Sequence, residues 1–182
     1  MDKSKNPWQK KSSKITYTTP YYSVREDDVI RPDGKEGKYY VLDIAPSVFI
    51  VPVTENNEIY LVGLYRYTTN MFSWEVPAGA ADNTNLLEGA KRELQEETGL
   101  VAKDWRELGK LQAFNGRSNN FQYVFVAKDV EQSNDNSQLE EGIKEVRKVS
   151  YKNVLEMIKK NEITDSESIA AITLAALHLK MT

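Results

Sequence analysis

Apolar residues along the chain fall in short runs that polar turns separate, which is the pattern of a sheet-rich domain. Residues 47–53 form a nearly continuous apolar run, which indicates a strand buried on both faces. The polar segment 55–58 and the apolar segment 59–65 follow it, and the three segments together predict a hairpin. Further runs of β-branched and aromatic residues predict strands at 15–18, 21–24, 39–42, 108–114, 121–128 and 145–150.

Helical patterns begin in the middle of the chain and return near its C-terminus. Asn85 followed by Glu88 is a capping-box pattern, which predicts that a helix begins at Leu86. Gly99 suits the left-handed position after a helix, so we expect this helix to end at Thr98. Two more helices are predicted at 151–160 and 166–180.

The order of these elements, mostly strands with few helices, predicts a mixed α/β or α+β sandwich in which helices cover a β-sheet. Residues 1–44 combine a basic, polar start with short strands around a turn signal at residues 31–34. We expect them to form a tail and a small N-terminal β subdomain. Residues 45–182 hold the remaining elements and form the main domain.

Composition excludes several classes of protein. Lys and Arg number 24 against 27 Asp and Glu, and the net charge of -3 gives no electrostatic reason to expect a nucleic acid or a membrane as partner. The chain has no Cys, and His178 is its one His, so a zinc site of the usual kind is excluded. Any metal should be a hard cation held by carboxylates. The N-terminus lacks the apolar core of a signal peptide and no long apolar run occurs, so we expect a cytoplasmic location.

The predicted helix at residues 86–98 carries the most informative chemistry. At about 100° per residue, Glu93, Glu96 and Glu97 fall within about 100° of one another, beside an apolar arc that includes Leu94. Like charges at this spacing repel by roughly a few tenths of a kcal/mol per pair, and a divalent cation would relieve the repulsion. A solvated acidic face is the ordinary alternative for three glutamates on a helix.

The surrounding residues favour the metal site over that alternative. Residues 92–100 read Arg-Glu-Leu-Gln-Glu-Glu-Thr-Gly-Leu, which resembles the second half of the Nudix box, the motif of the Nudix hydrolases. The first half departs from the motif. Ala78 or Gly79 falls at its glycine position, and with Gly79 the box is one residue short. The early Glu that braces the box arginine in the family is absent, and Glu88, one turn before Arg92, is expected to replace it.

The resemblance covers nearly the whole chain, which is similar to the ADP-ribose pyrophosphatase-like branch of the family. The segments that carry it include 24–27, 32–34, 65–67, 74–79, 163–166 and 170–171. In the loop 115–120 the match is partial, and Asn120 stands where the branch often has a Glu. The resemblance implies a Nudix-type sandwich, with residues 1–44 as the N-terminal β subdomain and residues 45–182 as the Nudix hydrolase domain.

The resemblance also implies a metal centre. Its expected ligands are Glu93, Glu96, Glu97 and the backbone carbonyl of Ala78. They would hold Mg²⁺, with Mn²⁺ as the alternative and more than one ion expected, to neutralise diphosphate oxygens and orient the attacking water. Arg92 belongs to the catalytic set as the box arginine. Since an amide is no base, Asn120 cannot take the proton of the water, and we expect Glu96 or Glu97 to do so.

Three further residues are candidates for binding the substrate. Arg66 is expected to clamp the diphosphate, because a guanidinium matches phosphate in a bidentate geometry, and Arg117 is the second candidate. Trp74 is a candidate for stacking on a base, with core packing as the alternative. The same two alternatives apply to Tyr21, Tyr22 and Phe114.

These implications favour hydrolysis of the diphosphate bond of a nucleoside diphosphate linked to another group, first of all ADP-ribose to AMP and ribose 5-phosphate. Nucleotide sugars such as GDP-mannose are the alternative substrates. A catalytically weak domain that binds or senses a nucleotide, and a purely structural domain, are the competing hypotheses. The expected partner is a small-molecule nucleotide rather than a nucleic acid or a membrane. We also expect a homodimer, since similar proteins often share their N-terminal strands.

Overall fold

The computed structural model describes residues 5–81, 85–133 and 137–181. The chain forms two compact units. One consists of the chain up to Ala45 together with Gln112–Phe121, and the other of Pro46–Leu111 together with the chain from Gln122 onward. Within the described ranges, no helix is long and apolar enough to cross a membrane.

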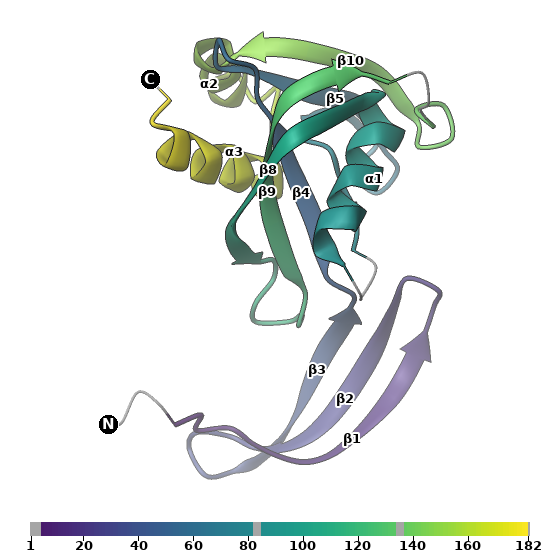
Figure 1. Ribbon diagram of the computed structural model, residues 1–182. Coiled ribbons are helices and arrows are strands. Elements are labelled where there is room, and N and C mark those ends of the chain that lie inside the picture. The colour runs from purple at the N-terminus through teal and green to yellow at the C-terminus, as the bar shows by residue number, and fades with distance from the viewer. Residues whose placement is uncertain (1–4, 82–84, 134–136, 182) are drawn as a thin grey trace. The chain divides into compact units, whose positions relative to one another are not determined.

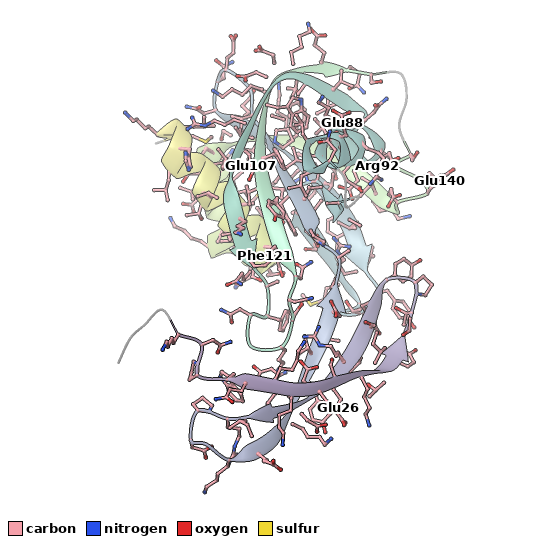
Figure 2. The ribbon with its side chains drawn as sticks, turned by 60° about the horizontal axis from the view of Figure 1, so that its bottom comes forward. Glu26, Glu88, Arg92, Glu107, Phe121 and Glu140 are labelled. Carbon is pink, nitrogen blue, oxygen red and sulfur yellow. The ribbon has the colours of Figure 1, made fainter. Side chains whose placement is uncertain are left out.

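The first unit is built on a three-stranded antiparallel sheet (Figure 1). Its strands, in spatial order, are β1 (Gln9–Thr18), β2 (Tyr22–Ile30) and β3 (Glu36–Ile44). The turn predicted between β2 and β3 is confirmed, since Gly34 has a φ of 81° and its N–H donates to the Arg31 carbonyl at 2.9 Å. Ion pairs across the sheet join Glu26 of β2 (Figure 2) to Lys14 and Lys38.

Strand β1 is longer than its sequence predicts. The prediction covered residues 15–18, whereas β1 begins at Gln9, where the pairing with Ile30 of β2 starts. Every residue of β1 is exposed. The strand therefore lacks the alternation of apolar and polar residues that a sequence pattern detects, and hydrogen bonding to β2 sets its length.

In the part of the second unit that the structure describes, the chain forms two sheets and three helices. One sheet has the order β7-β4-β9-β8, with β4 and β9 parallel, and the other is antiparallel with the order β10-β5-β6. The strands are β4 (Ser47–Pro52), β5 (Glu58–Arg66), β6 (Met71–Glu75), β7 (Ala78–Ala80), β8 (Leu100–Gln112), β9 (Phe121–Gln132) and β10 (Ile143–Ser150). The helices are α1 (Leu86–Thr98), α2 (Tyr151–Lys159) and α3 (Ser166–Leu179).

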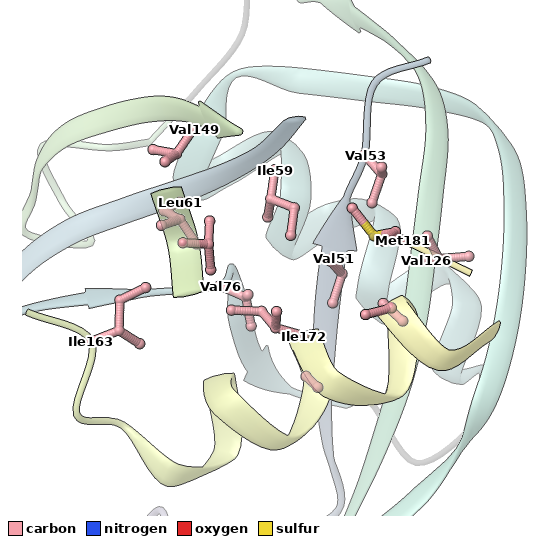
Figure 3. Packing of buried hydrophobic residues seen from close by; sticks show 14 of the residues in the cluster. Val51, Val53, Ile59, Leu61, Val76, Val126, Val149, Ile163, Ile172 and Met181 are labelled. Atoms are coloured by element: carbon pink, nitrogen blue, oxygen red, sulfur yellow. The ribbon is translucent and has the colours of Figure 1, made fainter. Parts of the chain in front are cut away.

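Helices α1 and α3 cover opposite faces of the sheet that contains β4 (Figure 1). Neighbouring residues of β4 point to opposite faces, so Val51 packs in one cluster with Ile172 of α3 and Ile50 packs in another with Leu94 of α1. Figure 3 shows the first cluster, which β5 enters through Leu61. Strand β4 is thus buried on both faces, as its apolar run predicts, and the predicted sandwich of a mixed sheet between helices is confirmed.

Candidate active site

Helix α1 begins and ends where its sequence predicts. The Asn85 side chain accepts hydrogen bonds from the N–H groups of Leu87 and Glu88 at 3.2 and 3.3 Å. Gly99 lies in the left-handed region with a φ of 70°, and its N–H donates to the Gln95 carbonyl at 2.8 Å. Local hydrogen bonds therefore fix both ends of the helix, and with them the directions of the side chains that it carries.

The apolar side of α1 anchors the helix on the sheet. Ala90 and Leu94 are fully buried among residues of β4 and β9. Glu93 and Glu97 lie next to this apolar side and are each 7% exposed, while Glu96 is half-buried. Glu93, Glu96 and Glu97 form what we call the carboxylate stripe. Because it is largely withdrawn from solvent, the stripe is not an ordinary solvated acidic face.

Glu97 reaches from α1 to β7. Its carboxylate accepts a hydrogen bond from the Ala78 N–H at 3.0 Å. Burial raises the pKa of Glu97, as does the negative charge of Glu93, while the Ala78 hydrogen bond and the Arg66 charge lower it, and the net pKa is about 8. Glu97 therefore needs additional positive charge nearby if it is to be ionised at neutral pH.

The carboxyl group of Glu93 lies directly against the backbone of β7 at Gly79. A Cβ atom placed on Gly79 would lie 2.2 Å from the Glu93 carboxyl carbon and 2.4 Å from both carboxyl oxygens. Burial raises the pKa of Glu93, although the charge of Arg92 opposes the shift. Ala78 and Gly79 were the two alternatives for the glycine of the box. Gly79 is the one at which a side chain would collide with the carboxyl group of Glu93.

Arg92 ties the stripe to β7. It forms ion pairs with Glu93 at 2.9 Å and Glu96 at 3.0 Å, and it donates to the Ala80 carbonyl at 3.2 Å. Glu88, which was expected to brace Arg92, forms its ion pair with Lys91 at 2.8 Å and has a side chain that is 61% exposed. That expectation is corrected: Glu88 lies on the solvent side of the helix (Figure 2), and the brace comes from the stripe and from β7.

The donor set of the stripe suits a hard divalent cation. Arg92 pairs with two of the three carboxylates, those of Glu93 and Glu96, and burial raises the pKa of both Glu93 and Glu97. Within the described ranges, no three acidic side chains already converge on one point. The carboxylates are held by Arg92 and the Ala78 N–H, and they are the ends of flexible side chains. The residues present therefore fit an oxygen-coordinated cation.

Arg66, the expected diphosphate clamp, lies at the end of β5 in a two-pronged ion pair with Glu75 of β6. Its Nε donates to one carboxylate oxygen at 3.0 Å, and its Nη2 donates to the other. The hydrogen bond to Glu75 raises the pKa of Arg66, and the charges of Glu97 and Asp165 act in the same direction. Arg66 and Glu97 are thus brought into one electrostatic neighbourhood. Glu75 is a residue of this site that the sequence analysis missed.

A second missed residue is Glu141, in the loop that precedes β10. Its carboxylate is exposed, and its negative charge contributes to the raised pKa of both Glu93 and Glu97. The loop, whose neighbouring residue Glu140 is labelled in Figure 2, therefore brings the Glu141 carboxylate into the field of the stripe. A polar loop has no periodic pattern, so nothing in the sequence distinguished Glu141 from a solvated residue.

Trp74, a predicted stacking residue, lies in the hydrophobic core of the second unit. The residue is 7% exposed. The Phe72 ring packs edge-on with its centroid 5.5 Å from that of Trp74, and the Arg147 guanidinium carbon lies 4.2 Å from the centroid of the Trp74 ring. A ring with so little exposed surface cannot stack on a base without repacking. Burial therefore supports the core alternative for Trp74.

The remaining predicted substrate-binding residues belong to the first unit. The Arg117 carbonyl accepts from the Leu42 N–H at 2.7 Å, and the Arg117 N–H donates to the Phe114 carbonyl at 2.6 Å, which attaches this loop to β3. Tyr21 is 83% exposed and Phe114 71%. Their roles in substrate binding, like that of Tyr22, stay predictions.

The chain resembles known proteins over most of its length. Residues 43–172 match the NUDIX domain, and residues 8–42 match the nucleoside diphosphate sugar hydrolase N-terminal domain. The chain is 28% identical over 148 residues to an ADP-ribose pyrophosphatase of Bacillus subtilis (strain 168), with 80% of each protein covered. It is 34% identical over 120 residues to an ADP-ribose pyrophosphatase of Mycobacterium tuberculosis (strain ATCC 25618 / H37Rv), which covers 64% of this chain and 57% of that protein.

A solved structure shares the fold. The crystal structure of an ADP compounds hydrolase superposes with a TM-score of 0.83 over 95% of this chain and 94% of that chain, at 19% sequence identity. The matched NUDIX domain spans the stripe, Gly79, Arg66 and Glu75, and enzymes with this domain generally use divalent metal ions. The chain is therefore a member of the Nudix hydrolase family.

Proposed function

We propose that this protein hydrolyses the diphosphate bond of a nucleoside diphosphate linked to another group, and that ADP-ribose, cleaved to AMP and ribose 5-phosphate, is its main substrate. The observation that carries the proposal is the largely buried carboxylate stripe, which packs against β7 and whose Glu97 acts electrostatically on Arg66. The two relatives named ADP-ribose pyrophosphatase support the choice of substrate.

The stripe and the backbone carbonyl of Ala78 would hold Mg²⁺, with Mn²⁺ as the alternative and more than one ion expected. When bound, the cation neutralises the charge of the diphosphate and orients the attacking water. Glu93 and Glu97 need such a counter-charge, because burial raises the pKa of each. Glu97 also fixes the backbone at Ala78 through the 3.0 Å hydrogen bond from its N–H.

Hydrolysis adds water across the P–O–P bridge. The water oxygen forms the new bond to phosphorus, the bridging oxygen leaves with the second phosphate, and a carboxylate takes the proton. Arg66 binds the diphosphate through its guanidinium. The general base is Glu96 or Glu97 of the stripe, or Glu141 of the loop before β10, which differs from the other two because it is not needed to hold the cation.

A pair of matched variants separates these bases. Glu141→Gln is compared with Glu140→Gln, its neighbour in the same loop. A loss of kcat of about 100-fold or more in Glu141→Gln alone would assign the base to Glu141. An unchanged kcat in both variants would leave the role to the stripe.

Two other functions remain as alternatives. The match of residues 8–42 to a nucleoside diphosphate sugar hydrolase domain favours nucleotide sugars such as GDP-mannose. The engagement of Glu93 and Glu96 by Arg92 favours a catalytically weak domain that binds a nucleotide. The homodimer stays a prediction in either case.

A substrate panel distinguishes these functions. We expect kcat/KM with Mg²⁺ to be higher for ADP-ribose than for GDP-mannose or ATP by at least about 10-fold, with AMP as the product. Preference for GDP-mannose with GMP as product would transfer the proposal to nucleotide sugars. A folded protein that is stabilised by the nucleotides but cleaves none of them would refute the enzymatic proposal in favour of binding.

A further inference from the structure

Glu75 is a buried carboxylate outside the carboxylate stripe. It lies on β6 between the core residues Trp74 and Val76, faces Val62 of β5 in the register, and is 5% exposed. Burying an ionised carboxylate is costly unless the charge is paired and hydrogen-bonded. The role of Glu75 therefore depends on the group that pairs with its carboxylate.

That partner is Arg66, and the geometry of the pair is specific. The guanidinium nitrogens Nε and Nη2 of Arg66 donate to the two carboxylate oxygens of Glu75, the first at 3.0 Å. Two parallel hydrogen bonds fix the plane of the guanidinium, which one bond would not. The Arg66 side chain remains 49% exposed, so it is held in place and still accessible to a ligand.

Arg66 also lies in the field of Glu97. The Glu97 carboxylate accepts the Ala78 N–H at 3.0 Å, three residues after Glu75 along the chain, so Glu97 lies near the pair of Glu75 and Arg66. The negative charges of Glu97 and Asp165 also act on the Arg66 guanidinium. Without the charge of Glu75, these two carboxylates would still attract the guanidinium. A pair between Arg66 and Glu97 would withdraw the guanidinium from the diphosphate and the carboxylate from the cation at the same time.

We propose that Glu75 is a positioning residue that holds Arg66 in the orientation that binds the diphosphate and prevents Arg66 from pairing with Glu97. The inference rests on the proposed function for the diphosphate. It deepens that function, because it assigns to Glu75 the role of keeping Arg66 apart from the metal ligands. Glu75 itself need not touch the substrate.

The test removes the charge of Glu75 and keeps its shape. Glu75→Gln is compared with Arg66→Ala, with the double variant, and with Glu58→Gln as the control. Glu58 pairs with Lys148 at 3.3 Å at the other end of β5, so its variant also removes one ion pair of this sheet. Mn²⁺ is titrated without substrate, and kcat and KM for ADP-ribose are measured separately. We expect Glu75→Gln to raise the midpoint concentration of the Mn²⁺ titration and the KM for ADP-ribose by about 10-fold each. Glu58→Gln should change neither quantity.

The double variant is decisive. Because Arg66→Ala removes the group that competes for Glu97, the double variant should recover the wild-type Mn²⁺ midpoint while its KM stays as high as that of Arg66→Ala. A midpoint that stays raised in the double variant, or an unchanged midpoint in Glu75→Gln, would overturn the proposal.

Two further outcomes keep the test informative. If Glu75→Gln does not fold, Glu75→Asp keeps the charge on a shorter side chain and should give a smaller rise in both quantities. Wild-type values of both quantities in Glu75→Asp, or a midpoint that stays raised in the double variant, would then overturn the proposal. If the wild type cleaves no diphosphate but the Mn²⁺ midpoints follow the expected order, the proposed function fails and the separation of Arg66 from Glu97 stands.

Discussion

Replacing Gly79 by Ala separates the position of Glu93 from the stability of the fold. The added Cβ would lie 2.2 Å from the Glu93 carboxyl carbon, whereas ordinary van der Waals contact begins at 3.4 Å. The carboxyl group must therefore move by about 1.2 Å. It is the end of a flexible side chain, and the φ of Gly79 is outside the left-handed region, so the backbone can stay where it is.

Stability and activity should then respond differently. Ala is favoured over Gly in a strand by roughly 0.5–1 kcal/mol, and a displaced Glu93 rotamer costs roughly 0.5–1.5 kcal/mol. The free energy of unfolding should therefore change by less than about 1 kcal/mol. A misplacement of about 1 Å at a catalytic centre can lower the rate by about 100-fold, and we expect that loss in kcat/KM of Gly79→Ala.

The assay combines urea unfolding with initial rates on ADP-ribose, with Gly116→Ala as the control. A Cβ on Gly116 meets no atom within 4 Å, and its φ also lies outside the left-handed region, so both quantities should stay at wild-type values. Full activity of Gly79→Ala would refute the argument that Glu93 works from its position against β7.

Two further predictions concern stability. In the metal-free protein the pKa of Glu97 is about 8, above its usual 4.5, so between these values the folded state keeps a proton that the unfolded state has lost. Stability should therefore fall as pH rises, by up to about 1.4 kcal/mol per pH unit, and Glu97→Gln should lose this slope in urea unfolding with EDTA at about pH 6 and pH 8. Parallel pH dependences of wild type and variant would contradict the burial argument. Ser168→Ala should cost roughly 1–3 kcal/mol of unfolding free energy, because the buried Ser168 hydroxyl accepts the Val76 N–H at 3.1 Å. The exposed Ser166→Ala should cost less than about 0.5 kcal/mol, and equal losses would count against the role of Ser168.

The helix that carries the site could be predicted because its signals are local. Asn85 and Gly99 mark its ends through hydrogen bonds to residues within one turn. The spacing of Glu93, Glu96 and Glu97 fixes their common side as soon as the helix is known. For the same reason, the continuous apolar run of β4 predicted a strand buried on both faces.

Contacts between distant segments could not be predicted in this way. Ser168 reaches Val76 across 92 positions, and Glu75 finds Arg66 only when β5 and β6 pair. A sequence pattern gives the apolar and polar faces of an element but not the neighbour that each face meets. Trp74 illustrates the same point, since an aromatic residue type serves in a core as well as in a binding site, and its 7% exposure, which no sequence pattern gives, favours the core.

The approach of Glu93 to Gly79 combines both kinds of information. The box pattern offered Ala78 and Gly79 as alternatives for one position, and counting residues could not choose between them. The structure favours Gly79, because the carboxyl group of Glu93 occupies the volume that a side chain at this position would need.

The rate of AMP release from ADP-ribose, measured with Mg²⁺ and with EDTA for the wild type and for Glu97→Gln, tests the central claim most directly. The stripe predicts that release by the wild type requires Mg²⁺ and falls by at least about 100-fold in a Glu97→Gln protein that remains folded. Release that persists in EDTA, or that is equal in the two proteins, would contradict the assignment of the reaction to this site.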